Sequence, residues 1–439
     1  MLFRSTISGK AGSANEVSFK DAILDCLPPD GGLYIPSKVM DLRQFFLYMN
    51  EGITFSELVT TLAPALFDAG LNPVSSSRVA ESAFDFEPEI KTLDENISIL
   101  NLYNGPTGSF KDFGIAFFAS VLEEIIRDKG HAMILSAVRG DDGLNLERAF
   151  HGRKGLISVM LYPSGPIHGL NPQSYVTNGG NIIPVQVKGN LDDCQALVNE
   201  TINDRPFSKR HNITSANTIN PLRLLPQAFY YLYAYIKIKK ILAGDLFFSI
   251  PSGNFGNLIS ALYAWKAGLP VNGFIASMNA NNSLGEFLMG GDFKPKPVIA
   301  TNSPALDVGI PSNLSRLESF RNESPSVMRN MVFPASVGND ETFKAMEEAW
   351  KLYGELLDPH AAVALSAARN FLKAEKHRCS HVIVLATGHP AREAAIIRSA
   401  TGQNVEIPEK LQLLKKDAAP VAIIDSCPDA LKSAIASCV

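Results

Sequence analysis

The stretch NLYNGPTGSFKDFG, residues 101–114, passes from an apolar run into an amphipathic one and decides how the chain around it is expected to fold. Gly105, Pro106 and Gly108 are residues that end a strand and form a turn, so the following residues are expected to open a helix. The first turn of that helix presents Lys111. Because an exposed lysine is most often only solvated, spacing alone gives Lys111 little weight as a functional residue.

From about residue 96 onward, short apolar runs alternate with longer amphipathic ones. The expected strands are ISILNLY, HAMILSAV, GLISVMLYP, GNIIPVQVK, DLFFSI and HVIVLATGHP, and the expected helices are DFGIAFFASVLEEIIRD, LNLERAFHG, a long aromatic helix near 218–241, and LISALYAWKAG. Strands that alternate with helices predict a mainly parallel α/β sheet. Ligands bind beyond the carboxyl ends of such strands, so we expect the site among the turns that follow them.

The residues before this alternating pattern have a different composition. They are rich in Pro and Gly and include two stretches with helical apolar spacing, VSFKDAILDCL and TFSELVTTLAPALFDAGL. We therefore predict a small N-terminal, mainly helical domain.

Composition excludes several classes of protein. The 439 residues are enough for two to four domains, and 40 basic against 44 acidic side chains give a net charge of −4, which disfavours nucleic-acid and membrane-surface partners. The five cysteines are scattered without CxxC spacing and the eight histidines form no HExxH motif, so we expect neither a disulfide framework nor a metal site. Without an apolar leader or spanning segment, we expect a cytoplasmic protein with no membrane partner.

A second turn, PSGNFGN at residues 251–257, follows an apolar run and precedes a helical one. Several backbone N–H groups with little side-chain obstruction form a cradle for phosphate at a helix N-terminus. The same physics serves a dinucleotide site or a tight structural turn, and the loop alone does not separate these alternatives. Its spacing lacks GxGxxG, which disfavours the dinucleotide.

A third turn, LATGHP at residues 385–390, places Thr387 after an apolar strand. Its hydroxyl is suited to meet a ring nitrogen, and equally suited to cap a helix. Lysine, phosphate cradle and strand-end hydroxyl together are the three parts that a pyridoxal phosphate site requires. The combination is more specific than any one of its members.

With these motifs, nearly the whole chain resembles the threonine synthase family of fold type II pyridoxal phosphate enzymes. VSFKDAILDCLPPDGGLYIP resembles the family's opening and GPTGSFKDFG its cofactor-lysine motif, while LDVGIPSNLSRL, DPHAAVA and TGHPA resemble later landmarks. The resemblance implies that Lys111 is the Schiff-base lysine and that Thr387 meets the pyridine nitrogen. The residues that it implies for the cofactor phosphate are Gly253, Asn254, Phe255, Gly256 and Asn257.

The resemblance also implies a fold and a division into domains. The fold is α/β, with two open, mainly parallel sheet domains of the tryptophan synthase β-like architecture and an extra N-terminal, mainly helical region. The ranges are 1–95 for the N-terminal domain, 96–125 with 205–439 for the large cofactor-binding domain, and 126–204 for a small mobile substrate domain.

The segment SANTINPLRLLPQAFYYLYAY also matches the family. Its Asn217, Thr218 and Arg223 fall where the family binds the phosphate of O-phosphohomoserine. Arginine suits this role because its planar fork forms paired charge-assisted hydrogen bonds to phosphate oxygens. Without the resemblance, Arg223 would be interpreted as a charge on a helix surface.

Two segments depart from the family pattern. The family's TSGDTG loop, which meets the substrate carboxylate, reads VRGDDG at 138–143, and YPSGPIHGLNPQSY at 162–175 also differs from the usual sequence. The resemblance places Arg139 and Asp141 at the substrate. Arg139 is suited to replace the lost hydroxyls by pairing with a carboxylate, whereas Asp142 repels one unless it faces away or is itself paired.

The function implied by the resemblance is the conversion of O-phosphohomoserine and water to threonine and phosphate, with a small phosphorylated amino acid as partner and Lys111 as the base that moves protons. One alternative is a related lyase acting on another phosphorylated amino acid or hydroxy compound, supported by the departures at Val138, Arg139 and Asp142. Another is a non-catalytic binding or regulatory homologue. The sequence leaves the oligomeric state undecided.

Overall fold

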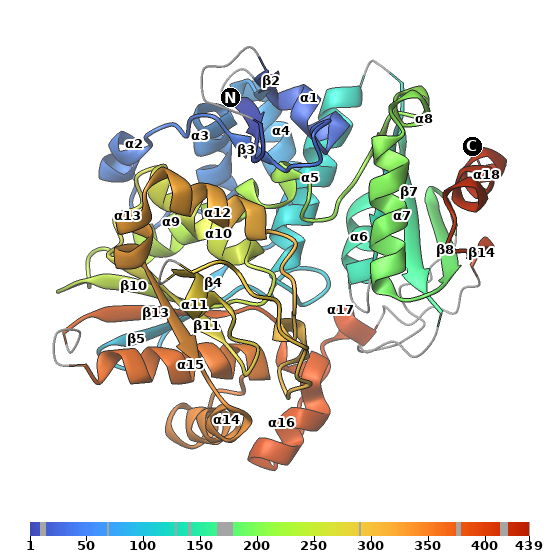
Figure 1. Ribbon diagram of the computed structural model, residues 1–439. Coiled ribbons are helices and arrows are strands. Elements are labelled where there is room, and N and C mark those ends of the chain that lie inside the picture. The colour runs from blue at the N-terminus through green and yellow to red at the C-terminus, as the bar shows by residue number, and fades with distance from the viewer. Residues whose placement is uncertain are drawn as a thin grey trace.

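The computed structural model describes residues 1–8, 15–67, 70–127, 130–138, 142–164, 179–288, 291–374, 379–412 and 420–438. Two sheets with helices on their faces organise the molecule, and an N-terminal region packs beside the larger one (Figure 1). This arrangement confirms the fold class expected from the sequence. None of the helices in these ranges combines the length and the apolar character needed to cross a membrane.

The larger sheet has six strands in the order β12-β11-β10-β13-β5-β4. Neighbouring strands pair in parallel except β4, which pairs antiparallel with β5 at one edge. The strands are β4 (Glu89–Thr92), β5 (Ile97–Asn101), β10 (Leu246–Pro251), β11 (Gly273–Met278), β12 (Val332–Ser336) and β13 (His381–Ala386). The three strands that precede the predicted site turns, β5, β10 and β13, are therefore adjacent in the sheet.

Both faces of the larger sheet are buried at its four central strands, as their continuous apolar sequences predict. Alternate residues of β10 show the two faces: Phe248 and Ile250 belong to one apolar cluster, whereas Phe247 belongs to another. The first cluster contains residues of α5 (Lys111–Ile126), α9 (Ala228–Ile238) and α10 (Gly256–Lys266). The second contains residues of α14 (Asn339–Tyr353) and α15 (Pro359–Leu372).

The smaller sheet is parallel throughout, in the order β14-β8-β7-β6-β9. Its strands are β6 (Ala132–Ala137), β7 (Leu156–Pro163), β8 (Ile182–Lys188), β9 (Ile213–Thr214) and β14 (Ala422–Asp425), and its helices are α6 (Asp142–Phe150), α7 (Leu191–Asn203), α8 (Arg205–Arg210) and α18 (Pro428–Cys438). Strands β9 and β14 come from outside 126–204. The domain ranges expected from the sequence remain predictions.

The N-terminal region combines a three-stranded antiparallel sheet with four helices. Its elements are β1 (Leu2–Ser5), β2 (Val17–Ser18), α1 (Phe19–Asp25), β3 (Tyr34–Pro36), α2 (Arg43–Tyr48), α3 (Phe55–Phe67) and α4 (Pro73–Ala83). Helix α4 packs against α5, and α3 packs against α9. The region therefore shares its core with the larger sheet.

The long helix predicted near 218–241 is shorter in the structure. Two 3-10 turns, η2 (Pro221–Arg223) and η3 (Leu225–Gln227), precede α9. Each turn begins with or contains a proline, Pro221 or Pro226, and a proline lacks the N–H that a continuous helix needs. This prediction was wrong in its boundary, and the correction brings Arg223 onto a buried turn.

The remaining helices follow the turns of the larger sheet. They are α11 (Leu284–Leu288), η4 (Pro304–Leu306), α12 (Leu314–Glu323), α13 (Pro325–Met331), η6 (Pro390–Glu393), α16 (Ala394–Thr401) and α17 (Glu409–Gln412).

We predict that Phe55→Ala destabilises the protein by about 3–5 kcal/mol, because the ring is fully buried and its loss leaves a cavity. The ring packs edge-on against Phe84, Phe113 and Tyr233 at centroid distances of 4.9, 5.2 and 5.5 Å. Urea unfolding measures the change. The matched control is Leu47→Ala on α2, which is 78% exposed and is expected to change stability by less than about 0.5 kcal/mol. Equal unfolding midpoints for the two variants would contradict the shared core.

Candidate active site

The three predicted turns meet at one edge of the larger sheet, where β5, β10 and β13 end. The turn before Lys111 is bonded directly to the turn that contains Thr387. The Phe110 N–H donates to the Thr387 carbonyl at 2.9 Å, and the His389 N–H donates to the Gly108 carbonyl at 2.8 Å. These backbone bonds fix two of the three turns to each other.

Lys111 is half-buried at the first position of α5, and the next residue anchors that helix turn. The buried carboxylate of Asp112 accepts from the Thr107 N–H at 2.9 Å, the Thr107 hydroxyl at 2.7 Å and the Asn145 amide at 2.6 Å. Burial raises the pKa of Asp112, while the bonds from Thr107 act in the opposite direction. A Cβ on Gly105 would lie 2.5 Å from Asp112 Oδ2, so glycine is needed there.

The loop after β10 is shaped for close approach. A Cβ on Gly253 would lie 2.9 Å from both the Ala305 carbonyl oxygen and the Leu306 Cα. Phe255 adopts the left-handed conformation, with φ of +58°, and Gly256 then begins α10. A strained residue before a helix N-terminus is a frequent sign of a ligand site, and the first N–H groups of the helix attract an anion.

Asn257 lies in the first turn of α10, and the oxygen of its side-chain amide is hydrogen-bonded whereas the nitrogen, within the described part of the chain, is not. Burial raises the pKa of the Tyr230 and Tyr231 hydroxyls well above the usual value, so both stay protonated and donate to Asn257 Oδ1. The Asn257 Nδ2 donor is buried and has no acceptor among the described residues. An orphaned donor beside this loop fits an anionic ligand.

Asn254 and Thr218 belong to one hydrogen-bond network beside the loop. Asn254 Oδ1 accepts from the Ser312 N–H at 2.6 Å, and the Asn313 amide donates to Thr218 Oγ1 at 3.2 Å. Arg316 is buried beneath them and donates to the Thr218 carbonyl and, at 2.7 Å, to Asn313 Oδ1. Burial lowers the pKa of Arg316 to about 10, so it keeps its charge at neutral pH.

Arg223 lies against the helix that carries Lys111. A Cβ on Gly114 would lie 2.5 Å from both the Arg223 Nη1 and the Arg223 carbonyl oxygen. Gly114 is three residues from Lys111, which places both on one side of α5. The structure therefore brings the buried Arg223 guanidinium to the same face of α5 as the lysine.

The other predicted residues have different outcomes. Thr387 is nearly buried, 9% exposed, at the end of β13. Asn217 follows β9 in the chain, and its side-chain amide bonds the last residue of β6. It accepts from the Ala137 N–H at 2.9 Å and donates to the Ala137 carbonyl at 2.8 Å. Arg139 and Asp141 lie outside the described residues.

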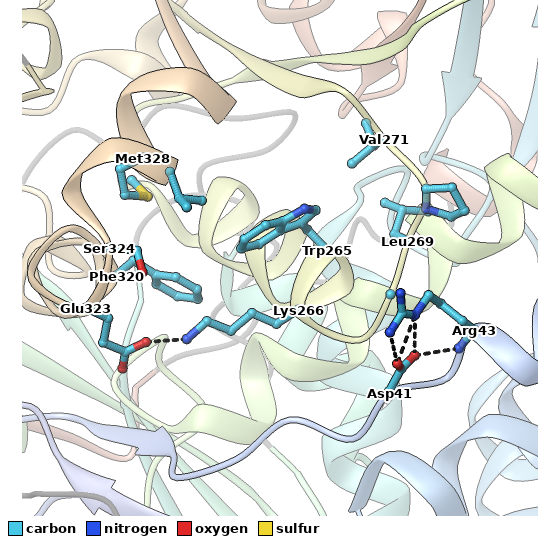
Figure 2. Close-up of a pocket in the computed structure, with 13 residues that line it drawn as sticks. Asp41, Arg43, Trp265, Lys266, Leu269, Val271, Phe320, Glu323, Ser324 and Met328 are labelled. Carbon is cyan, nitrogen blue, oxygen red and sulfur yellow. Dashed lines mark hydrogen bonds and ion pairs between the residues drawn. The ribbon is translucent and has the colours of Figure 1, made fainter.

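A separate pocket of about 650 Å³ lies at the opposite end of α10 (Figure 2). Trp265 and Phe320 form apolar parts of its wall, and Lys266 pairs with Glu323 at its side. The residues that line it include none of those predicted for the site. The strand-end turns, rather than this pocket, are the candidate active site.

Comparisons with known proteins identify the family of the chain. The family model "Pyridoxal-phosphate dependent enzyme" matches residues 87–388, "Threonine synthase N terminus" matches 3–72, and "Threonine synthase, C-terminal" matches 361–435. Threonine synthase from Serratia marcescens is 34% identical over 401 residues, which are 91% of each chain. This chain belongs to the threonine synthase family.

Solved structures of threonine synthases share the fold over nearly the full length. The Escherichia coli enzyme has a TM-score of 0.86 at 30% identity and full coverage of both chains. The PLP-bound enzyme from Brucella melitensis has the same TM-score at 27% identity, covering 99% of this chain and 98% of that one. The chain is therefore a pyridoxal phosphate-dependent lyase of the threonine synthase family, and the glycine cradle and orphaned Asn257 donor fit the cofactor phosphate.

Several residues of the site were not predicted from the sequence. Asp112 and Asn145 hold the lysine turn, and Ser312, Asn313 and Arg316 hold the residues beside the phosphate loop. Asp112 stands within the FKDFG motif, and Ser312, Asn313 and Arg316 stand within LDVGIPSNLSRL. The sequence therefore marked these four residues as part of family motifs but did not indicate what each one does. Asn145 has no such motif, and only its contact reveals it.

We predict that Gly114→Ala destabilises the protein by about 1–3 kcal/mol, because the new methyl group meets a backbone carbonyl that cannot move cheaply. In an open helix the same change is neutral or stabilising by up to about 1 kcal/mol. Gly285→Ala is the matched control, since Gly285 is also helical and has nothing within 4 Å of the added carbon. Thermal unfolding of both variants measures the difference, and a neutral Gly114→Ala would refute the close approach of Arg223.

Proposed function

We propose that this enzyme converts O-phosphohomoserine and water to threonine and inorganic phosphate, and that it does so in the cytoplasm. The observation that carries the proposal is the buried Arg223 guanidinium against Gly114, on the same side of α5 as Lys111. A fixed cation stabilises the charge on a phosphate as it leaves, so a reaction that releases phosphate favours such a cation beside the substrate. The resemblance of the surrounding motifs to the threonine synthase family supports the same reaction.

Two anion sites of different construction support a cofactor and a phosphorylated substrate. The first is the N-terminus of α10, with Gly253, Phe255, Gly256 and the orphaned amide of Asn257, and we assign it to the cofactor phosphate. The second is Arg223, and we assign it to the substrate phosphate, since its planar fork pairs with phosphate oxygens.

Lys111 is assigned the proton transfers. When bound, pyridoxal phosphate takes up the electron pair left at the substrate carbon after deprotonation. The Lys111 amine is assigned to accept and return the proton, a role that requires the amine to be neutral when it acts as a base. The Asp112 anchor keeps the amine aligned, because the bonds from Thr107 and Asn145 fix the first turn of α5.

The remaining substrate contacts stay predictions. Thr218 is half-buried beside Asn254, and we assign it with Asn217 to the substrate phosphate. Arg139 and Asp141 are assigned to the substrate carboxylate from the resemblance alone. Thr387 is assigned to the cofactor ring nitrogen, because its turn is bonded to the Lys111 turn.

We predict that the enzyme forms threonine and phosphate in equal amounts from O-phosphohomoserine, and that Lys111→Ala abolishes both products. The reason is that Lys111 is assigned two roles, the Schiff-base lysine that binds the cofactor and the base that transfers the proton. Phosphate release and threonine formation are measured together, and the visible absorbance of the cofactor is recorded for each protein. Lys239→Ala is the control, since Lys239 is also half-buried, donates to the Phe46 carbonyl at 3.1 Å and is not assigned to the site.

Full turnover by Lys111→Ala would overturn the mechanism. A protein that binds pyridoxal phosphate but releases no threonine would instead support a lyase for a different phosphorylated compound, as the altered 138–143 loop suggested.

We predict that Arg223→Ala weakens the binding of phosphorylated substrate by about ten- to a hundredfold, because a charge-assisted bond to phosphate is worth about 1.5–3 kcal/mol. The cofactor content is expected to stay normal. KM for O-phosphohomoserine and bound pyridoxal phosphate are measured on the same samples. Arg321→Ala is the control, because Arg321 donates to the backbone carbonyls of Phe287 and Gly291 and is not assigned to the site. Loss of cofactor from Arg223→Ala would show that this arginine serves the cofactor phosphate instead.

A further inference from the structure

A buried carboxylate and a buried imidazole lie next to each other at the start of α15. Asp358 and His360 are 2% and 7% exposed, and Asp358 Oδ2 lies 2.6 Å from His360 Nδ1. Asp358 Oδ1 also accepts from the Ala361 N–H at 3.0 Å and so caps the helix. The proposed reaction assigns no role to either side chain.

The hydrogen bonds determine which nitrogen of His360 carries the proton. The Ala305 N–H donates to His360 Nε2 at 3.1 Å, and a backbone N–H can only donate. Nε2 is therefore unprotonated, and Nδ1 carries the proton that it donates to Asp358 Oδ2. A carboxylate on one side and a backbone donor on the other leave a single tautomer.

The pair is linked to both turns assigned to the cofactor, directly to one and through Ala305 to the other. On one side, Ala305 is the residue whose carbonyl oxygen would lie 2.9 Å from a Cβ on Gly253, in the phosphate loop. On the other side, a Cβ on Gly388 would lie 3.1 Å from Asp358 Oδ2, so the carboxylate lies against the residue that follows Thr387. The chain of contacts runs from the Thr387 turn through Asp358, His360 and Ala305 to the phosphate loop.

We infer that Asp358 and His360 are a positioning pair that sets the separation between the phosphate loop and the Thr387 turn, and thereby the affinity for pyridoxal phosphate. The cofactor must reach both turns at once, with its phosphate at one and its ring nitrogen at the other. Because the cofactor has a fixed length, its affinity depends on the separation of the two turns. Turns that are already held at the right separation lose less free energy when the cofactor binds. This inference rests on the proposed roles of Gly253 and Thr387, and not on the substrate.

Two substitutions separate the two bonds of His360. His360→Asn keeps an amide near the position of Nδ1, and so keeps a donor to Asp358, but it has no atom that reaches the Ala305 N–H. His360→Gln places an amide oxygen near the position of Nε2 and keeps an acceptor for Ala305. The pair of variants therefore tests the link to the phosphate loop rather than the loss of the ring.

The apoenzymes are titrated with pyridoxal phosphate, and the ³¹P chemical shift of the bound phosphate is recorded. We expect His360→Asn to bind the cofactor about tenfold more weakly, with a changed ³¹P shift, and His360→Gln to stay within about threefold of the unmodified protein. His381→Asn is the matched control, because His381 is also 7% exposed and its Nε2 lies 2.9 Å from Ser98 Oγ, at the amino end of β13, so this change likewise removes the Nε2 bond. It is expected to lower the unfolding midpoint without changing cofactor affinity.

Three results would overturn the inference: unchanged affinity in His360→Asn, equal weakening in both His360 variants, or equal weakening in His381→Asn. Gly253→Ala is measured in parallel. If that variant keeps full affinity, the assigned phosphate loop is wrong, and the failure lies with the proposed site rather than with the positioning pair. Since no substrate is present, the outcome is independent of the proposed reaction.

Discussion

The parallel pairing of β10 with β13, and of β13 with β5, is the constraint on which the site depends. Registers such as Phe248 opposite Ile383 and Val384 opposite Ile99 bring the ends of the three strands to one edge. Turns that are far apart in the chain therefore meet there. The backbone bonds between residues 108–110 and 387–389 then join the lysine turn to the Thr387 turn, so the geometry is built from main chain before any side chain contributes.

Close approach is the second requirement, and small residues meet it. Gly105 admits the Asp112 carboxylate, Gly114 admits Arg223, and Gly253 admits the backbone at Ala305 and Leu306. Each contact is closer than a Cβ allows. Helix α5 combines several of these features. It contributes buried residues to the core, begins at Lys111 and carries Gly114 against Arg223. Its position brings the buried Arg223 against the side of the helix that carries Lys111.

Sequence reasoning named the residues of the candidate site that lie in short motifs, and their roles stay predictions. Lys111, the glycines of 253–257 and Thr387 each follow an apolar strand, and that local order is readable without a structure. The supporting contacts were not predicted, because they join distant segments: Asn145 to Asp112 across 33 residues, and Arg316 to Thr218 across 98. The helix expected near 218–241 was wrong in its start because two prolines replace its first turns with 3-10 structure.

The sequence by itself determined the alternation of strand and helix, the turns at the strand ends and the residue types that bind a cofactor, since periodicity and turn chemistry are local properties. Only the tertiary structure decided which strands are neighbours, that β14 joins the smaller sheet, and that Asp358 and His360 link the two turns assigned to the cofactor. Sheet order and side-chain contacts depend on how whole faces pack. That packing energy is shared among residues hundreds of positions apart, and no short window of sequence contains it.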